Sequence, residues 1–272
     1  MTSAWLRDAE DHLLQRLGAA AHVFCCLDYD GTLAPLAPSP DEAAPLPGTA
    51  ALLRQLTAAP GTAVAVVTGR TIDDVRRFLD VPGVYYVGIH GLEVRLPTGE
   101  MQAAADGDAM RPTLQKIAAR LRDALGSRPG ILIEDKGAAL ACHYRLASPS
   151  DAAMARALMA ALAQEYERDG IALIYGHEVA ELRPQGVSKG QTVCALLAAH
   201  GANSLAVYIG DDETDEDAFR MMPPDAVTIR VAPVTTTAAR YVVTSPVEVQ
   251  HFLRSLALVR SHPMTDRLGA CA

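Results

Sequence analysis

The stretch His22-Val-Phe-Cys-Cys-Leu-Asp-Tyr-Asp-Gly-Thr-Leu33 decides the fold of this chain. Residues 22–27 form a short apolar run that stops at the polar residues 28–32. An apolar run bounded by a polar turn is typical of a strand that is buried on both faces, as strands are in parallel sheets covered by helices. We therefore expect a buried strand here, with Asp28 and Asp30 at its end.

The same pattern recurs further along the chain. An apolar run over 63–67 ends at Thr68-Gly-Arg70, and a run over 84–89 ends at His90 and Gly91. The other elements expected in this part are helices near 6–17, 49–58 and 72–79 and a loop over 34–48, which holds five prolines. Strands that alternate with helices at these spacings predict a parallel α/β sheet with right-handed crossovers.

The middle of the chain has a different pattern. A helix over 110–125, two strands over 130–136 and 138–145, a helix over 150–169 and a hairpin over 171–183 are expected. This order predicts a small α+β domain with an antiparallel sheet. From Lys189 the first pattern returns, with a helix to 200, strands at 205–209 and 226–231, and the turn 210–215 between them. We therefore predict an α/β protein with a Rossmann-like parallel-sheet core, 1–108 and 185–272, and an inserted α+β domain, 109–184.

The composition of the chain argues against several classes of binding partner. It has 272 residues and a net charge of −8, which disfavours sequence-independent nucleic-acid binding, because such binding relies on basic residues that neutralise phosphates. No basic patch for a membrane surface, no apolar run of about 18 residues and no signal peptide is found. The five cysteines contain no CxxC pair, so we expect buried thiols and no zinc site. We expect a cytoplasmic monomer whose partner is a small-molecule substrate.

Polar residues collect at one edge of the predicted sheet. In an open parallel sheet, ligands bind beyond the carboxyl ends of the strands. The residues delivered there are Asp28, Asp30, Thr68, Arg70, His90, Glu93, Asp211, Asp212 and Asp215. Clustered carboxylates repel one another, and Mg²⁺ with its preference for oxygen ligands is their natural counterion. Lys189, at the start of a helix, adds a positive charge beside amide donors for an anion. This set is what phosphoryl chemistry requires.

Two other interpretations of these motifs fail. Asp28-Tyr-Asp-Gly31 lacks the third oxygen ligand and the closing Glu of a calcium loop. Gly210-Asp-Asp-Glu213 follows an apolar strand, as in nucleotide hydrolases, but the chain has no G-x-x-x-x-G-K-[ST] loop.

Four ordered motifs carry a family resemblance. Asp28-Tyr-Asp-Gly-Thr-Leu33, Thr68-Gly-Arg70, Lys189-Gly190 and Gly210-Asp-Asp-Glu-Thr-Asp-Glu216 resemble those of the haloacid dehalogenase-like phosphohydrolases. Within that superfamily the chain resembles the trehalose-6-phosphate phosphatase family over nearly its whole length. The further marks of that family are Gly88-Ile-His-Gly-Leu-Glu93, Glu134-Asp-Lys136, His143-Tyr-Arg145 and Glu181-Leu-Arg-Pro184.

The resemblance implies a Mg²⁺-dependent phosphatase that hydrolyses trehalose 6-phosphate through an aspartyl-phosphate, in trehalose biosynthesis. By motif position, Asp28 is the implied nucleophile and Asp30 the general acid and base, and Thr68 and Lys189 hold the phosphoryl group. The implied metal residues are Asp28, Asp30 and Asp211, with Asp212 and Asp215 orienting metal-bound waters. The implied substrate-binding residues are Arg70, His90, Gly91 and Glu93 in the core and Glu134, Lys136, Arg145 and Glu181 in the inserted cap domain.

Three alternatives stay open at this point. A related capped phosphatase acting on sucrose phosphate or a mannosyl-phosphoglycerate shares the same core and differs only in cap residues. A phosphomutase needs a cap that retains and reorients an intermediate, and no sequence feature excludes it. A catalytically dead relative that binds a sugar phosphate is disfavoured because Asp28 and Asp30 are both present.

Overall fold

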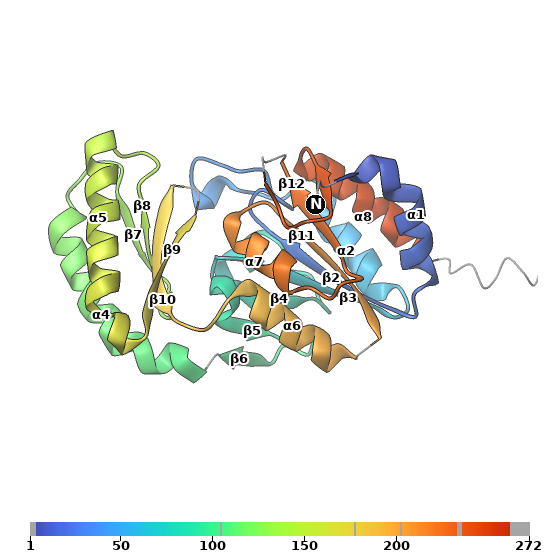
Figure 1. Cartoon of the computed structure of the whole chain (residues 1–272), viewed down its shortest axis with the longest axis horizontal. Coiled ribbons are helices and arrows are strands. Elements are labelled where there is room, and N and C mark those ends of the chain that lie inside the picture. The colour runs from blue at the N-terminus through green and yellow to red at the C-terminus, as the bar shows by residue number, and fades with distance from the viewer. Residues whose placement is uncertain (1–3, 104, 177, 202, 233–235, 262–272) are drawn as a thin grey trace, which may run out of the picture. The chain divides into compact units, whose positions relative to one another are not determined.

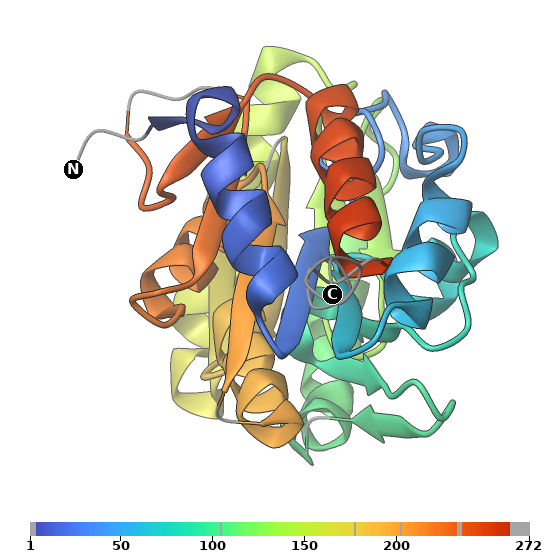
Figure 2. The same cartoon turned by 90° about the vertical axis from the view of Figure 1, so that its right-hand side faces the viewer.

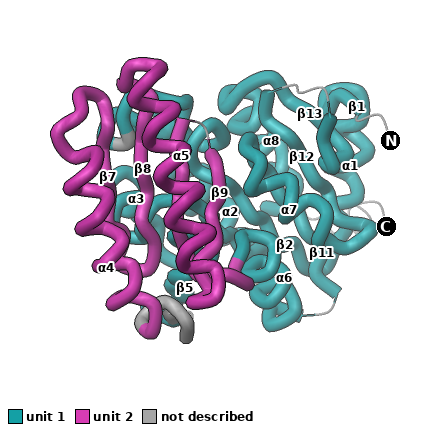
Figure 3. The backbone as a smooth tube through the Cα atoms, turned by 60° about the vertical axis from the view of Figure 1, so that its left-hand side comes forward, with its two compact units in different colours: residues 1–102, 188–272 teal, residues 103–187 magenta. Residues whose placement is uncertain are grey.

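The chain folds into two compact units, coloured separately in Figure 3. The computed structural model describes residues 4–103, 105–176, 178–201, 203–232 and 236–261. Unit 1 comprises Met1–Gln102 and Ser188–Ala272, and unit 2 comprises Ala103–Val187. The predicted insertion, 109–184, lies within unit 2.

Unit 1 is built on a nine-stranded sheet of order β1-β13-β12-β11-β2-β3-β4-β5-β6. Its strands are β1 (Ala4–Trp5), β2 (His22–Asp28), β3 (Thr62–Val67), β4 (Tyr85–Gly88), β5 (Glu93–Arg95), β6 (Met101–Ala103), β11 (Ser204–Gly210), β12 (Val227–Val231) and β13 (Tyr241–Val243). Every pairing from β1 to β4 in this order is parallel, whereas β5 is antiparallel to β4. The predicted α/β fold is confirmed, with an antiparallel addition at one edge.

Helices cover both faces of this sheet (Figure 1). They are α1 (Leu6–Ala19), α2 (Thr49–Ala58), α3 (Ile72–Phe78), α6 (Lys189–His200), α7 (Glu213–Met221) and α8 (Pro246–Ser261). In β2, Val23, Cys25 and Leu27 pack with residues of α1, α2, α3 and α8, while Phe24 and Cys26 pack with residues of α6 and α7. Successive strand residues point to opposite faces, so burial on both faces requires the unbroken apolar run that the sequence shows.

Unit 2 is a four-stranded antiparallel sheet of order β7-β8-β10-β9 with two helices on one face. Its elements are α4 (Ala105–Leu125), β7 (Leu132–Asp135), β8 (Leu140–His143), α5 (Pro149–Glu165), β9 (Ile171–Gly176) and β10 (Val179–Pro184). Cys142, Ala180 and Leu182 pack against these helices. Because side chains alternate along a strand, Glu181 and Arg183 belong to the opposite face. The predicted antiparallel sheet is confirmed.

Several elements of unit 1 were not predicted. Strands β1, β5, β6 and β13 have two or three residues each, which is too short to show a period of two. Helix α8 was also missed, and in unit 2 helix α4 starts at Ala105 instead of the predicted residue 110.

Among the described residues no helix is both long and apolar enough to span a membrane. Cys25, Cys26, Cys142 and Cys194 are free thiols, and Cys271 lies outside the described residues.

A buried guanidinium joins α8 to α1 and to the turn before β3. Helices α1 and α8 lie side by side (Figure 2). Arg260, near the end of α8, donates to the carbonyls of Leu17, Ala20, Ala21 and Pro60 and to Thr62 Oγ1. Three of these carbonyls lie at or just beyond the end of α1, where helix carbonyls have no partner within the helix. Arg260 therefore satisfies groups that would otherwise be buried without hydrogen bonds.

Replacing this arginine tests that conclusion. Arg260→Met is expected to lower the free energy of unfolding by about 3 kcal/mol or more, because several buried carbonyls lose their donor. The matched control is Arg254→Met on the exposed face of α8, where we expect a change within about 0.5 kcal/mol. Urea unfolding followed by circular dichroism measures both. Equal losses for the two variants would contradict the role given to Arg260.

Candidate active site

Three strands bring the predicted residues to one edge of the sheet. Asp28 is the last residue of β2, and its Cα pairs with that of Val67 in β3, so Thr68 follows beside it. On the other side of β2, β11 ends at Gly210, directly before Asp211. Asp28, Thr68 and Asp211 therefore share the carboxyl edge of the sheet, as the sequence predicted.

Lys189 holds two of the carboxylates together. Its Nζ donates to Asp28 Oδ1 at 2.7 Å and to Asp215 Oδ1 at 2.9 Å, and all three side chains are buried. Lys189 is the first residue of α6, a position fixed by Ser188, whose hydroxyl accepts a hydrogen bond from Gln191 N at 3.2 Å and caps the helix. The helix start thus places one ammonium between β2 and α7.

Asp215 is an organising residue of this cluster. Its Oδ1 accepts from Lys189 and from the Tyr208 hydroxyl at 2.8 Å, and its Oδ2 accepts from the backbone N–H groups of Asp211 and Asp212 at 3.1 and 3.0 Å. A carboxylate offers about four lone-pair positions, so these four hydrogen bonds use its capacity. Asp215 therefore fixes both the lysine and the turn that carries Asp211.

The charges of the cluster suit a divalent cation. Ligand oxygens of Asp28, Asp211 and Asp215 lie within 4.8 Å of one another, and with one ammonium beside them the formal excess is two negative charges. Burial and then Asp215 raise the pKa of the Asp211 carboxyl to about 7. Burial likewise raises the pKa of Asp28, although Lys189 opposes it. For Lys189 burial lowers the pKa, but the two carboxylates outweigh it and raise the pKa above its ordinary value.

Open oxygens in the cluster also fit a metal. Asp28 Oδ2 is buried and has no hydrogen-bond partner among the described residues. No described donor contacts the Asp211 carboxylate either. Leaving a buried carboxylate oxygen without a partner is costly, and a hard cation such as Mg²⁺ binds carboxylate oxygens. The donor set therefore fits Mg²⁺, with open oxygens on Asp28 and Asp211 and a saturated carboxylate on Asp215.

Asp30 is held by an arginine. Arg70 Nε donates to Asp30 Oδ2 at 2.7 Å and Arg70 Nη2 donates to Asp30 Oδ1 at 2.6 Å, which is a bidentate ion pair. The guanidinium also lies 5.1 Å from the ring centre of Tyr29, whose hydroxyl donates to Ala43 O at 2.8 Å. Arg70, which was predicted to bind substrate, thus contacts Asp30, and its predicted role stays a prediction.

A strained turn carries the next predicted residues. Ile89 and His90 have φ values of 46° and 55°, a left-handed conformation that is an outlier for a β-branched residue. The His90 N–H donates to Thr68 O at 2.9 Å, and a Cβ at Gly69 would lie 2.5 Å from His90 Nε2. Strained backbone of this kind clusters at functional sites. The turn places the His90 ring against the Thr68-Gly-Arg70 segment.

Gly91 and Glu93 follow this turn. The Gly91 carbonyl accepts from the Thr192 hydroxyl of α6 at 3.3 Å. Glu93 Oε2 accepts from Ile72 N at 3.2 Å, at the start of α3, and burial raises the pKa of this carboxyl. Both residues therefore tie the turn to helices that flank the site.

The predicted residues of unit 2 form two polar pairs and a turn. Lys136 Nζ donates to Glu181 Oε2 at 2.6 Å, and both side chains are buried. Glu134 Oε2 lies 2.8 Å from His143 Nε2 across β7 and β8. Arg145 lies in the exposed turn after β8. Glu134 and Glu181 both pair with Ala141 of β8, and His143 follows two residues later, so these side chains belong to the face of the sheet opposite the helices, whereas Arg145 lies beyond the end of β8 that is far from Lys136.

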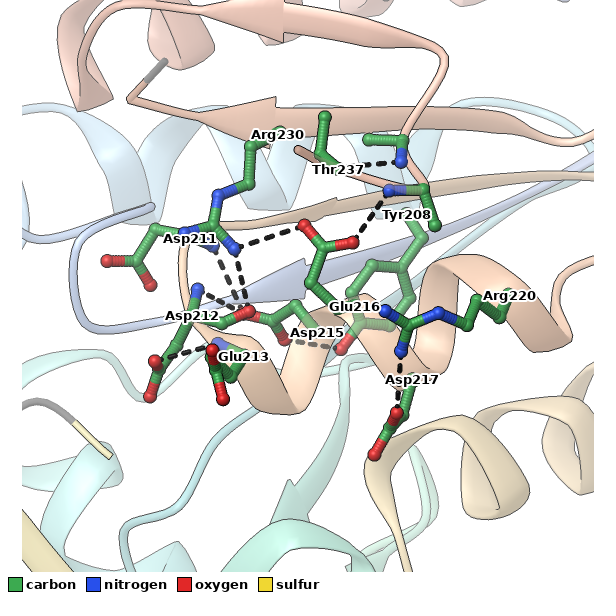
Figure 4. A network of polar contacts seen from close by, with 12 residues as sticks. Tyr208, Asp211, Asp212, Glu213, Asp215, Glu216, Asp217, Arg220, Arg230 and Thr237 are labelled. Atoms are coloured by element: carbon green, nitrogen blue, oxygen red, sulfur yellow. Dashed lines mark hydrogen bonds and ion pairs between the residues drawn. The ribbon is translucent and has the colours of Figure 1, made fainter. Parts of the chain in front are cut away.

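Residues that were not predicted complete the core site. Tyr208 contacts Asp215, and Arg230 donates to the carbonyl of Asp212 (Figure 4). A tyrosine inside the apolar run of β11 and an arginine inside that of β12 were the available signals. In unit 2, His143 and the buried Arg183 were likewise not assigned.

Gly31 lies so close to the Asp211 carboxylate that a side chain at this position has no room. A Cβ at Gly31, where φ is +77°, would lie 1.9 Å from Asp211 Oδ2, whereas at Gly48, where φ is +89°, it would meet nothing within 4 Å. Both alanine variants bear a left-handed strain of roughly 1–2 kcal/mol. We expect Gly31→Ala to displace Asp211 and weaken Mn²⁺ binding, measured by calorimetry, and Gly48→Ala to leave it unchanged. Equal Mn²⁺ affinities would contradict the placement of Asp211.

Comparisons with known proteins identify the family. A sequence model of the trehalose-phosphatase family matches residues 26–249. The trehalose-phosphate phosphatase of Mycobacterium marinum is 38% identical over 239 residues, which is 85% of this chain and 60% of that protein. The protein of the same name from Mycobacterium avium is 37% identical over 251 residues, 88% of this chain and 63% of that protein. The chain thus spans about three fifths of the length of the curated relatives that it matches.

Solved structures agree with this result. A trehalose-6-phosphate phosphatase related protein is 27% identical with a TM-score of 0.75, covering 87% of this chain and 97% of that one. The C-terminal domain of Candida albicans trehalose-6-phosphate phosphatase has the same fold, with a TM-score of 0.80 at 24% identity over 96% of this chain and 98% of that one. Because the family model matches most of the sequence, this chain belongs to the trehalose-phosphatase family.

Proposed function

We propose that the chain is a Mg²⁺-dependent phosphatase that hydrolyses trehalose 6-phosphate to trehalose and phosphate in trehalose biosynthesis. The proposal rests chiefly on the hydrogen bonding and burial of the two carboxylate oxygens of Asp28. One of its oxygens is fixed by Lys189 and the other is buried without a partner in the described chain, beside two further carboxylates. An oriented carboxylate oxygen at the end of a central strand is suited to attack a phosphorus atom.

In the first half of the reaction, Asp28 attacks phosphorus in line with the departing sugar oxygen. A bond forms between phosphorus and the Asp28 carboxylate, and the bond between phosphorus and the sugar oxygen breaks. Asp30, two residues further on, gives a proton to the departing oxygen, for which it first takes up that proton and leaves its ion pair with Arg70. Lys189 and Thr68 hold the phosphoryl oxygens, which offsets the negative charge that develops on them.

In the second half, Asp30 takes a proton from water, and the water oxygen attacks phosphorus. The bond to Asp28 then breaks and releases phosphate, so the enzyme returns to its starting state. Such acid–base transfer contributes roughly 10²–10⁴-fold to the rate. Asp28, Asp211 and the Asp30 carbonyl would hold Mg²⁺, which would supply Lewis-acid neutralisation of the phosphate dianion.

Unit 2 supplies specificity in this proposal. Trehalose offers hydroxyl groups and no charge beyond the phosphate, so its recognition depends on hydrogen bonds from fixed side chains. Lys136 and Glu181 are fixed by their buried ion pair, and Glu134 is fixed by His143. Arg145 is the fourth sugar-binding residue of unit 2 in this proposal, and His90, Gly91 and Glu93 are the sugar-binding residues of unit 1.

The reaction is tested by phosphate release from a panel of sugar phosphates. We expect faster release from trehalose 6-phosphate than from sucrose 6-phosphate or glucose 6-phosphate, and loss of release when a chelator removes Mg²⁺. Asp28→Asn is expected to abolish turnover, because an amide is not a nucleophile for phosphorus, whereas Asp41→Asn in the exposed proline-rich loop leaves it unchanged. Substantial turnover by Asp28→Asn would rule out the covalent route. Metal-dependent release with another preference would instead contradict the substrate.

Specificity is tested by comparing two substrates. Arg145→Ala and Glu134→Ala should each lower kcat/KM for trehalose 6-phosphate by about 10- to 100-fold, since a lost polar contact of this kind is worth about 1–3 kcal/mol. Turnover of p-nitrophenyl phosphate, which has no sugar, should change little. Arg156→Ala, an exposed arginine of α5 that stacks on Tyr175, is the control. Equal losses on both substrates would argue against sugar recognition by these residues.

A further inference from the structure

The side chains of Asp215 and Arg230 form hydrogen bonds with the backbone of the turn that carries Asp211 (Figure 4). From one side, Asp215 Oδ2 accepts the N–H groups of Asp211 and Asp212. From the other side, Arg230 Nη1 donates to the carbonyl of Asp212 at 2.8 Å. Since no described donor contacts the Asp211 carboxylate, no hydrogen bond fixes it directly, and its direction depends on this backbone.

Arg230 reaches the turn from the neighbouring strand. It lies near the end of β12, and its Cα pairs with that of Gly210, the residue directly before the turn. Its guanidinium is buried, and Nη1 also lies 3.4 Å from Glu216 Oε1. The other carboxylate oxygen of Glu216 accepts from Ala238 N at 2.7 Å. Arg230 and Glu216 thus connect β12, α7 and the segment before β13 to the turn.

Stability alone is a weak reason for this arrangement. Arg230 has one carboxylate partner, at 3.4 Å, and its buried Nε has no partner among the described residues. A buried ion pair that is incompletely hydrogen-bonded contributes little or nothing to stability, because the desolvation of both charges opposes it. The short contact is the one to the Asp212 carbonyl, and that contact acts on the turn.

We infer that Arg230 is a positioning residue for metal binding: through the Asp212 carbonyl it fixes the turn that presents the Asp211 carboxylate to Mg²⁺, and Glu216 orients Arg230. The inference rests on the proposed magnesium site. Residues that orient metal ligands typically change metal affinity by about 10- to 100-fold when they are lost.

The test is calorimetric titration of the full chain, free of substrate, with Mg²⁺ and with Mn²⁺. We expect Arg230→Met to raise the metal Kd by about 10-fold, at the lower end of the usual range, because Asp28 stays in place and Asp215 still accepts the N–H groups of the turn. Arg230→Lys should recover most of the affinity, since an ammonium can still donate to the Asp212 carbonyl. The control is Arg220→Met on α7, whose exposed guanidinium pairs with Asp217 and does not contact the turn (Figure 4).

Kinetics separate positioning from a merely structural role. In Arg230→Met the Mg²⁺ concentration for half-maximal phosphate release should rise by the same factor as Kd. At saturating Mg²⁺, kcat should return to within about 3-fold of the parent value. The variant binds the metal more weakly, but once the site is filled the reaction proceeds as in the parent chain. A lowered melting temperature with an unchanged metal Kd would overturn the inference.

The remaining outcomes are distinguishable. A parent chain that binds neither metal would overturn the proposed magnesium site. A parent chain that binds Mg²⁺, with Arg230→Met and Arg230→Lys binding it equally well, would overturn only the inference about Arg230. If Arg230→Met does not fold, Glu216→Gln decides, because it keeps an acceptor for Ala238 N but removes the charge that orients Arg230. A several-fold rise in Kd then supports the inference, and an unchanged Kd overturns it.

Discussion

The burial of one ammonium between two carboxylates is the constraint on which the core of this protein depends. Lys189 contacts Asp28, 161 residues earlier in the chain, and Asp215, 26 residues later. Removing either sign of charge would leave the other buried without compensation, which is strongly unfavourable. Because these residues lie on β2, α6 and α7, the pairing also fixes how two halves of unit 1, separated in sequence by unit 2, come together.

Several unfavourable features surround this ion cluster. The three carboxylates exceed the charge of the lysine, and burial raises the pKa of Asp28 and Asp211 further. Ile89 and His90 add left-handed backbone nearby. Apolar burial on both faces of the sheet offsets these costs, because β2, β3 and β11 carry almost no exposed residues. The sheet thus holds a charge distribution that would not assemble without a rigid core.

Motifs and apolar runs were sufficient to predict the strand ends and the residues that follow them. Asp28, Lys189 and Asp211 could be predicted because each stands in a short motif beside a recognisable strand or helix start. Tyr208 was missed because a tyrosine inside an apolar run does not show that its hydroxyl reaches Asp215 on the following helix. Arg230 could not be predicted, because its contact with the turn depends on β12 lying beside β11, and the order β12-β11-β2 cannot be read from local pattern. The bidentate contact between Arg70 and Asp30 was missed for the same reason, since it joins the ends of two different strands.

Asp211, Asp212 and Asp215 are the same residue type, but their carboxylates differ in how many hydrogen bonds they accept. A carboxylate whose oxygens already accept four hydrogen bonds has no lone pair left for a cation, whereas one without donors is open to it. Asp212 lies between these extremes, because its Oδ1 accepts from Glu213 N at the start of α7. Hydrogen-bond saturation therefore separates a carboxylate that is open to a metal from one that builds the site, and residue identity alone cannot make that distinction.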